Sequence, residues 1–213
     1  MIHIQKFTFS PIQENTYLLW NEKGHALIID PGCYFTAEQE TLHQFIKDHQ
    51  LTPVQLLNTH CHLDHVFGNK WVSKTFNLEL YIQPKEEQVL QFAPNSGLMW
   101  GLSFENYTGP LHFINAGDTI YLDEDELQVI LAPGHSPGHV CFYCKAQQFI
   151  IGGDVLFLES IGRTDLPGGN HQQLLNSIRE QLFVLPDATV VHPGHGPQTT
   201  IGHEKKYNPY LQM

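Results

Sequence analysis

The stretch Thr59-His60-Cys61-His62-Leu63-Asp64-His65 places four potential metal ligands within six residues. It follows Val54-Gln55-Leu56-Leu57, which is typical of a short buried strand, so the cluster begins where a strand gives way to a loop. His60 and His62 project together while the chain is extended, whereas the Asp-His pair that follows suits a chain turning into a helix. Neutral imidazoles with a carboxylate favour zinc or another first-row divalent metal over calcium or magnesium. The spacing predicts two metal ions rather than one.

Three later segments supply further ligands, and each follows a strand-like run. They are Ala132-Pro133-Gly134-His135-Ser136-Pro137-Gly138-His139, Ile150-Ile151-Gly152-Gly153-Asp154 and Val190-Val191-His192-Pro193-Gly194-His195-Gly196-Pro197. Glycine and proline beside each ligand suit tight turns. With the first cluster, these segments offer five histidines and two aspartates: His60, His62, His65, His135, His195, Asp64 and Asp154. That set is sufficient for two sites that share one bridging carboxylate.

In this order, HxHxDH, PGHSPGH, GGD and PGHG resemble the metallo-β-lactamase superfamily, and most closely its glyoxalase II-like (hydroxyacylglutathione hydrolase-like) members. The segment Gly162-Arg163-Thr164-Asp165-Leu166-Pro167-Gly168-Gly169 and the C-terminal residues 199–211 resemble the short bacterial type of that group. The resemblance extends from Asn15-Thr16-Tyr17 to the C-terminus. It implies an α/β fold in which two facing sheets carry helices outside, the four-layer αβ/βα sandwich.

The resemblance also implies how the ligands divide between two metals. It assigns His60, His62 and His135 to the first metal, Asp64, His65 and His195 to the second, and Asp154 to a bridge between them. Asp30, which ends the strand-like run 26–29, matches a family aspartate that braces the ligand loop and orients its imidazoles. We expect two divalent ions, with Zn²⁺ as the first candidate and iron or manganese as alternatives.

The chemistry expected of such a site is hydrolysis by hydroxide generated from water at two ions about 3.5–4 Å apart. The hydroxide attacks an acyl carbon while a metal polarises the carbonyl oxygen and stabilises the oxyanion. Asp64 and Asp154 are the candidate catalytic carboxylates. A thiolate leaving group needs little protonation, so the leading hypothesis is a thioesterase, with the small-molecule thioester S-D-lactoylglutathione as substrate.

Other functions are consistent with the same residues. A mononuclear iron persulfide dioxygenase, whose family also resembles the GRTD segment, would use His60 and the positions of His135 and Asp154. The chain ends at Met213 without the additional helical region with which longer glyoxalase II enzymes grip glutathione. Hydrolysis of another acyl ester or lactone therefore stays open. A non-catalytic binding protein predicts a damaged ligand set, and all seven ligands are present.

Composition agrees with one hydrolase domain over residues 1–213, with 41% hydrophobic and 11% aromatic residues. A net charge of −11 argues against a nucleic-acid partner, which would need clustered Lys and Arg. No run is apolar enough for a membrane span, and residues 1–7 alternate like a strand rather than a signal peptide. We expect reduced, buried cysteines, with Cys141 and Cys144 on opposite strand faces, and a cytoplasmic location.

Local patterns predict several elements. Residues 17–30 and 140–152 read as hairpins, the second turning at 145–148. Thr36 with Gln39 predicts a helix capping box, and Asn170 is the predicted cap of a later helix that carries an apolar face.

Two features allow a structural or a functional interpretation. Arg163 either pairs with Asp165 to support the loop or binds a substrate carboxylate. Residues 92–102 form either core or an apolar lid over the substrate. His139 and His192 are as well explained by structural roles as by contacts to the ligands, so we leave them outside the predicted site.

Overall fold

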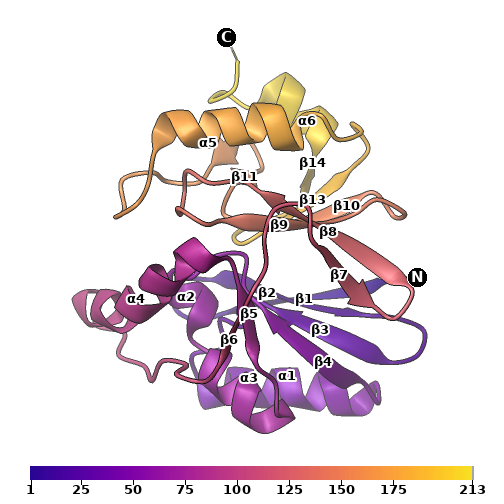
Figure 1. Ribbon diagram of the computed structural model, residues 1–213, viewed down its shortest axis with the longest axis vertical. Coiled ribbons are helices and arrows are strands. Elements are labelled where there is room, and N and C mark those ends of the chain that lie inside the picture. Colours follow the sequence, from indigo (N-terminus) through magenta and orange to yellow (C-terminus); the bar gives the residue numbers. More distant parts are fainter. Residues whose placement is uncertain (213) are drawn as a thin grey trace.

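Two six-stranded sheets face each other, and helices cover the outer face of each, in the computed structural model that describes residues 1–212 (Figure 1). The arrangement is a four-layer αβ/βα sandwich (Figure 1), which confirms the predicted fold class. The sheets come from successive halves of the chain, so the two halves meet along the faces of their sheets (Figure 1).

The first sheet has the order β1-β2-β3-β4-β5-β6. Its strands are β1 (His3–Phe9), β2 (Glu14–Trp20), β3 (His25–Ile29), β4 (Thr52–Leu57), β5 (Leu80–Ile82) and β6 (Leu111–Phe113). The first three strands pair antiparallel, and β3 through β6 run parallel. The helices of this half are α1 (Thr36–Asp48), α2 (Leu63–Val66), α3 (Asn69–Phe76), the 3₁₀ turn η1 (Pro84–Glu86) and α4 (Glu87–Met99).

The second sheet has the order β14-β13-β10-β9-β8-β7. Its strands are β7 (Thr119–Leu122), β8 (Asp125–Leu131), β9 (Val140–Cys144), β10 (Phe149–Gly153), β13 (Val190–Pro193) and β14 (Thr199–Thr200). A separate two-stranded ribbon joins β11 (Leu156–Phe157) and β12 (Ser160–Ile161). The outer helices are α5 (His171–Ser177), its π-helical continuation η2 (Ile178–Leu182) and α6 (Ile201–Tyr207).

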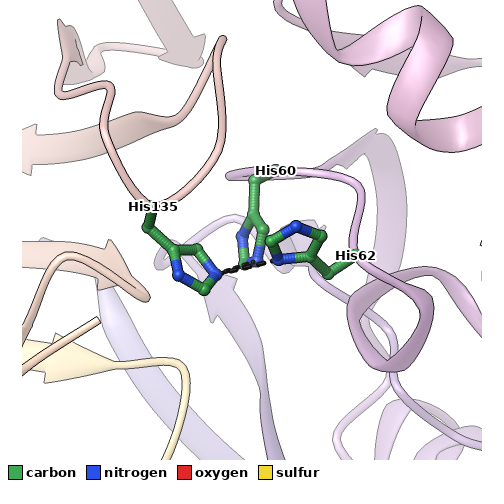
Figure 2. Close-up of side chains that lie close together, drawn as sticks. All are labelled: His60, His62 and His135. Carbon is green, nitrogen blue, oxygen red and sulfur yellow. Dashed lines mark hydrogen bonds between the residues drawn. The ribbon is translucent and has the colours of Figure 1, made fainter. Parts of the chain in front are cut away.

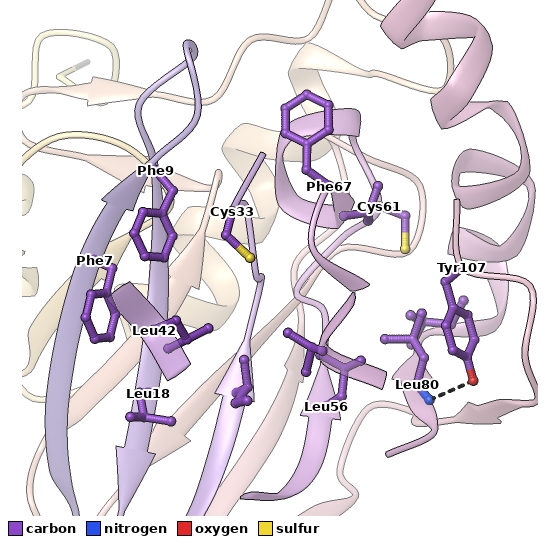
Figure 3. Packing of buried hydrophobic residues seen from close by; sticks show 14 of the residues in the cluster. Phe7, Phe9, Leu18, Cys33, Leu42, Leu56, Cys61, Phe67, Leu80 and Tyr107 are labelled. Carbon is purple, nitrogen blue, oxygen red and sulfur yellow. Dashed lines mark hydrogen bonds between the residues drawn. The ribbon is translucent and has the colours of Figure 1, made fainter. Parts of the chain in front are cut away.

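Strand alternation divides the core into three layers, because successive side chains point to opposite sheet faces. Leu18 packs under the helices of the first half, as Figure 3 shows, while the next residue, Leu19, packs between the sheets. Ile150 and Ile151 divide in the same way between the outer and inner faces of the second sheet. Leu18 is fully buried, so truncation to alanine should cost about 2–5 kcal/mol of unfolding free energy.

The predicted hairpins are present. Tyr17 pairs with Ile29 in the β2–β3 ladder, and the β9–β10 ladder turns between Cys144 and Phe149. Cys141 and Cys144 face different core layers, and all four cysteines are free and buried, as the sequence predicted. No helix within residues 1–212 has the length and apolar character needed to cross a membrane.

One predicted cap is confirmed and one is wrong. The Asn170 side chain accepts a hydrogen bond from the Gln173 amide at the start of α5.

Phe35, rather than Thr36, occupies the N-cap position of α1, so Thr36 is the first helical residue. The Glu38 carboxylate accepts hydrogen bonds from the amides of Tyr34 and Phe35 and also from the amide of Ser10. This long-range contact fixes the start of the helix and is invisible in the local pattern.

Candidate metal centre

The predicted ligands lie on segments that directly follow β4, β8, β10 and β13, with Asp64 and His65 in helix α2, so the sheets bring them to one edge of the sandwich. The first group is His60, His62 and His135 (Figure 2). Nδ1 of His62 lies 2.8 Å from Nε2 of His135, and Nε2 of His60 lies 3.2 Å from the same atom. Imidazole nitrogens bound at about 2.0–2.1 Å to one tetrahedral zinc would lie about 3.3 Å apart. The spacing of His60 and His135 therefore suits a shared ion.

The tautomers of His60 and His135 are fixed by their other ring nitrogens. Nδ1 of His135 lies 2.8 Å from the Arg163 carbonyl oxygen. Because a carbonyl oxygen only accepts, Nδ1 must carry the hydrogen and donate it. The Thr59 hydroxyl donates to the Asp30 carboxylate, so it accepts from Nδ1 of His60 at 3.1 Å. Both Nε2 atoms then present lone pairs to each other. Two facing lone pairs repel, and a cation between them removes the repulsion.

Protons cannot supply that cation in the first group. Burial lowers the pKa of His60 well below its ordinary value, and it lowers the pKa of His62 to about 3. Burial also lowers the pKa of His135. The three imidazoles are therefore neutral near pH 7, which is the form that binds a metal ion.

The second group is Asp64, His65 and His195. Nδ1 of His65 donates to Asp30 at 3.1 Å, and Nδ1 of His195 donates to the Gln13 carbonyl oxygen at 3.1 Å. Each Nε2 consequently faces inward, where that of His195 lies 3.1 Å from a carboxylate oxygen of Asp64.

The carboxylates in and beside the second group favour a positive charge between them. Burial opposes ionisation of His65, but the carboxylates of Asp154 and Asp64 outweigh it and raise its pKa well above the ordinary value. The pKa of Asp154 is lowered because His65 and His195 together outweigh the effect of its burial. Either protons or a metal ion can satisfy such a cluster.

Asp154 lies between the two groups. Its Oδ2 is 3.5 Å from Nε2 of His135 in the first group and 3.6 Å from Nε2 of His195 in the second. Its Oδ1 is 3.5 Å from Nε2 of His65, and neither of these two buried atoms has a hydrogen-bond partner among residues 1–212. A buried carboxylate oxygen and a ring nitrogen that face each other without a hydrogen bond are suited to hold a cation between them.

Asp30 connects the ligand loop to the first sheet, as the sequence predicted. Its carboxylate accepts hydrogen bonds from the Thr59 amide at 2.7 Å, the Thr59 hydroxyl at 2.6 Å and Nδ1 of His65 at 3.1 Å. Asp30 itself has the left-handed φ of 51°, which turns the chain sharply at the end of β3. Thr59 and Asp30 together orient one imidazole of each group.

Sequence reasoning missed Glu86, whose buried carboxylate joins two ligand loops. Oε2 accepts from the Cys61 amide at 2.9 Å, and Oε1 accepts from the Ser136 hydroxyl at 2.6 Å and the Gly138 amide at 2.7 Å. These contacts hold the loop of His60 and His62 against the loop of His135. No local pattern marks Glu86, because its partners are distant in sequence.

Sequence reasoning also left out His139, which contacts the site. Its Nε2 accepts a hydrogen bond from the Asp154 amide at 3.0 Å, and its ring stacks on His60 with centroids 4.7 Å apart.

Two glycines allow the close packing of side chains around Asp154 and His139. A Cβ on Gly153, at φ 50°, would lie 2.5 Å from Nε2 of His139, and one on Gly194 would lie 2.1 Å from Oδ1 of Asp154.

Arg163 forms the ion pair that one of the two interpretations predicts. Its Nε and Nη2 donate to the two Asp165 oxygens at 2.8 and 2.7 Å, with half of the arginine side chain exposed. Arg163 also lines a cavity of about 350 Å³ whose walls include Asp64, Asp154 and His195. The guanidinium is therefore paired at the surface and also borders the space above the candidate metals.

The candidate lid is helix α4 and its C-terminal end. Ala93 and Gly97 are buried, so part of the segment is core. Phe92 and Trp100 are exposed, and Trp100 lines the cavity above the ligands. The segment thus combines both interpretations: one side packs on the first sheet and the other borders the site.

Comparison with known proteins agrees with this geometry. The family model of the metallo-beta-lactamase superfamily matches residues 10–195. The chain is 35% identical over 212 residues to "Hydroxyacylglutathione hydrolase GloC" of Haemophilus influenzae, covering 99% of this chain and 98% of that one. The crystal structure of BLEG-1 B3 metallo-beta-lactamase superposes with a TM-score of 0.91 at 37% identity, covering 99% of this chain and all (100%) of that one.

A second solved structure, TTHA1623 in a di-iron-bound form, has a TM-score of 0.89 and 37% identity, covering 97% of this chain and 100% of that one. The described residues of the present chain hold the same class of His and Asp clusters that such metal-binding proteins require. Fold, site geometry and sequence similarity together show that this chain belongs to the metallo-β-lactamase superfamily and to its metal-dependent hydrolases.

Proposed function

We propose that this chain is a binuclear metal-dependent thioester hydrolase, with S-D-lactoylglutathione as the first substrate to test. The observation that carries the proposal is the position of Asp154, whose Oδ2 lies 3.5 and 3.6 Å from one imidazole of each ligand group. A carboxylate placed in this way is suited to bridge two ions. The relative named hydroxyacylglutathione hydrolase, which matches 99% of the chain, supports this substrate class.

The proposed ligands are His60, His62 and His135 for one ion and Asp64, His65 and His195 for the other, with Asp154 shared. Two such ions, with zinc as first candidate and iron or manganese as alternatives, would supply the Lewis acidity that lowers the pKa of a bound water and polarises an acyl carbonyl. The protein contributes the tautomers that aim each lone pair inward, through Asp30, Thr59 and the carbonyl oxygen of Arg163. Asp64 and Asp154 border the cavity, where their carboxylates can accept a hydrogen bond from an attacking water.

Arg163 is proposed to recognise an anionic group of the substrate. Its present partner, Asp165, is exposed, and exposed ion pairs contribute little net free energy. A substrate carboxylate can therefore compete with Asp165 for the planar guanidinium, which suits bidentate contacts.

The test combines metal analysis of the purified protein with S-D-lactoylglutathione hydrolysis under anaerobic conditions. We expect about two metals per chain and turnover that does not require oxygen. One iron per chain, no anaerobic turnover and oxygen consumption with glutathione persulfide would replace the proposal by the persulfide dioxygenase. Because BLEG-1 is described as a metallo-beta-lactamase, a chromogenic β-lactam belongs in the same assay. Faster cleavage of the β-lactam than of any thioester would contradict the proposed substrate class.

A further inference from the structure

A second cavity, of about 220 Å³, lies beside the metal centre under helix α4. Figure 1 shows α4 on the same side of the molecule as the loop that leads into α5, and residues of both segments line the cavity. Its apolar walls are Leu63, Val89, Phe92, Ala93, Pro137 and Leu166.

This cavity adjoins the ligands directly. His62, a member of the first ligand group, forms part of its wall. Leu63, Ser96 and Leu166 line both this cavity and the larger one above Asp64 and Asp154. A molecule that reacts at the metal centre can therefore extend into the cavity under α4.

The lining is predominantly apolar and holds few charged groups. Among the described residues that line it, none is a carboxylate and Lys85 is the sole lysine or arginine. Phe92 leaves 44% of its surface exposed here, although large apolar side chains gain free energy by burial. The site thus offers uncovered apolar surface next to the reacting centre, which is typical of a pocket for an apolar substrate group.

We propose that this cavity is an acyl pocket, so that the enzyme prefers thioesters with an unbranched aliphatic acyl group of several carbons. The inference rests on the proposed thioesterase function and specifies which half of the thioester confers selectivity. A thiol such as glutathione carries carboxylates and amides, and most of their hydration would be lost against the apolar wall, where Lys85, Gln88 and Ser96 are the few polar partners besides His62. An aliphatic acyl chain needs no such partners.

The test measures kcat/KM for a series with one thiol and increasing acyl length: S-acetyl, S-butyryl and S-hexanoyl glutathione. Each buried methylene should raise kcat/KM about fourfold until the cavity is full. The ratio of hexanoyl to acetyl activity in the metal-loaded wild-type protein should then be on the order of 10².

Two variants in the wall of the cavity change this ratio in a predictable way. Ala93→Leu fills the cavity and should reduce the hexanoyl-to-acetyl ratio to near one. Phe92→Ala removes an exposed wall, with little risk to folding, and should reduce the ratio several-fold. Leu98→Ala is the matched control, because Leu98 lies on the same helix, is 67% exposed and lines neither cavity. It should leave the ratio unchanged.

The outcomes separate this inference from the function on which it rests. Thioester turnover with equal kcat/KM across the series would overturn the acyl pocket alone. Equal effects of Phe92→Ala and Ala93→Leu on all three substrates would also overturn it, because a merely structural role predicts that result. Absence of turnover with every thioester would overturn the proposed function together with the pocket.

Discussion

Nε2 of His60 lies 3.2 Å from Nε2 of His135, and both rings donate from Nδ1 to other acceptors. Neither nitrogen can donate to the other, and the low pKa of both rings disfavours a proton between them. This pair is therefore the clearest sign that the fold is built around a cation.

Metal removal should destabilise the protein, because bound ions relieve the repulsion between these lone pairs. A divalent ion at 100 times its Kd adds about 2.7 kcal/mol to the unfolding free energy. We expect chelation to lower Tm and zinc to restore it, as followed by thermal unfolding. His60→Ala should show a smaller response to zinc. An unchanged Tm after verified metal removal would contradict this prediction.

Asp154→Ala should abolish turnover while the fold is kept. The change removes the carboxylate that lies within 3.6 Å of imidazoles from both ligand groups, so we expect kcat to fall on the order of 10³-fold or more. Circular dichroism would check the fold, and metal analysis the occupancy. Asp48→Ala, at the exposed end of α1, is the matched control. Near-normal activity and metal content in Asp154→Ala would refute the bridging role.

Glu86→Gln should weaken metal binding without contacting a metal. The glutamine oxygen can still accept from the Ser136 hydroxyl and the Gly138 amide, but the NH2 group that replaces Oε2 cannot accept from the Cys61 amide. Loss of such supporting contacts typically costs 10–100-fold in metal affinity, so we expect a shift of about that size. Competition with a chromophoric chelator measures it. Glu87→Gln, the next residue along, should bind metal like the wild type.

Arg163→Ala should raise KM for S-D-lactoylglutathione about tenfold, the lower end for a lost charge-assisted hydrogen bond. It should change Tm little, because its ion pair with Asp165 is exposed. A thioester of a thiol without carboxylates is the control substrate and should be unaffected. A marked fall in Tm with unchanged KM would show that the arginine is structural.

The stability of the protein should fall between pH 6.5 and pH 4 in part through His192. Burial lowers its pKa from 6.5 to about 4, so the unfolded chain binds more protons than the folded chain in that window. The free energy of unfolding therefore rises with pH in this window. At pH 4 the lowered pKa of His192 reduces that free energy by on the order of 1–3 kcal/mol.

His192→Gln should make urea-unfolding free energies less dependent on pH across this window than those of the wild type. His171→Gln, at an exposed position on α5, should leave the dependence unchanged. Identical pH profiles for wild type and His192→Gln would exclude the histidine as the cause.

The sequence by itself determined the identity of the seven candidate ligands, because they are concentrated in short segments that directly follow strands. Strand alternation and turn residues also predicted the hairpins and the opposite faces of Cys141 and Cys144, since both depend on neighbours within a few residues. The resemblance of the motifs to the metallo-β-lactamase superfamily predicted the order of the four layers of the sandwich.

Only the tertiary structure decided how the ligand loops are held together. Glu86 and Ser136 are 50 residues apart in the chain, and His135 takes its tautomer from a carbonyl oxygen 28 residues away. The start of α1 was mispredicted for the same reason, because Glu38 also accepts from the amide of Ser10, 28 residues earlier. Such contacts leave no local period or spacing in the sequence. They form because buried polar groups must find partners, and the packing of the two sheets determines which partners lie within reach.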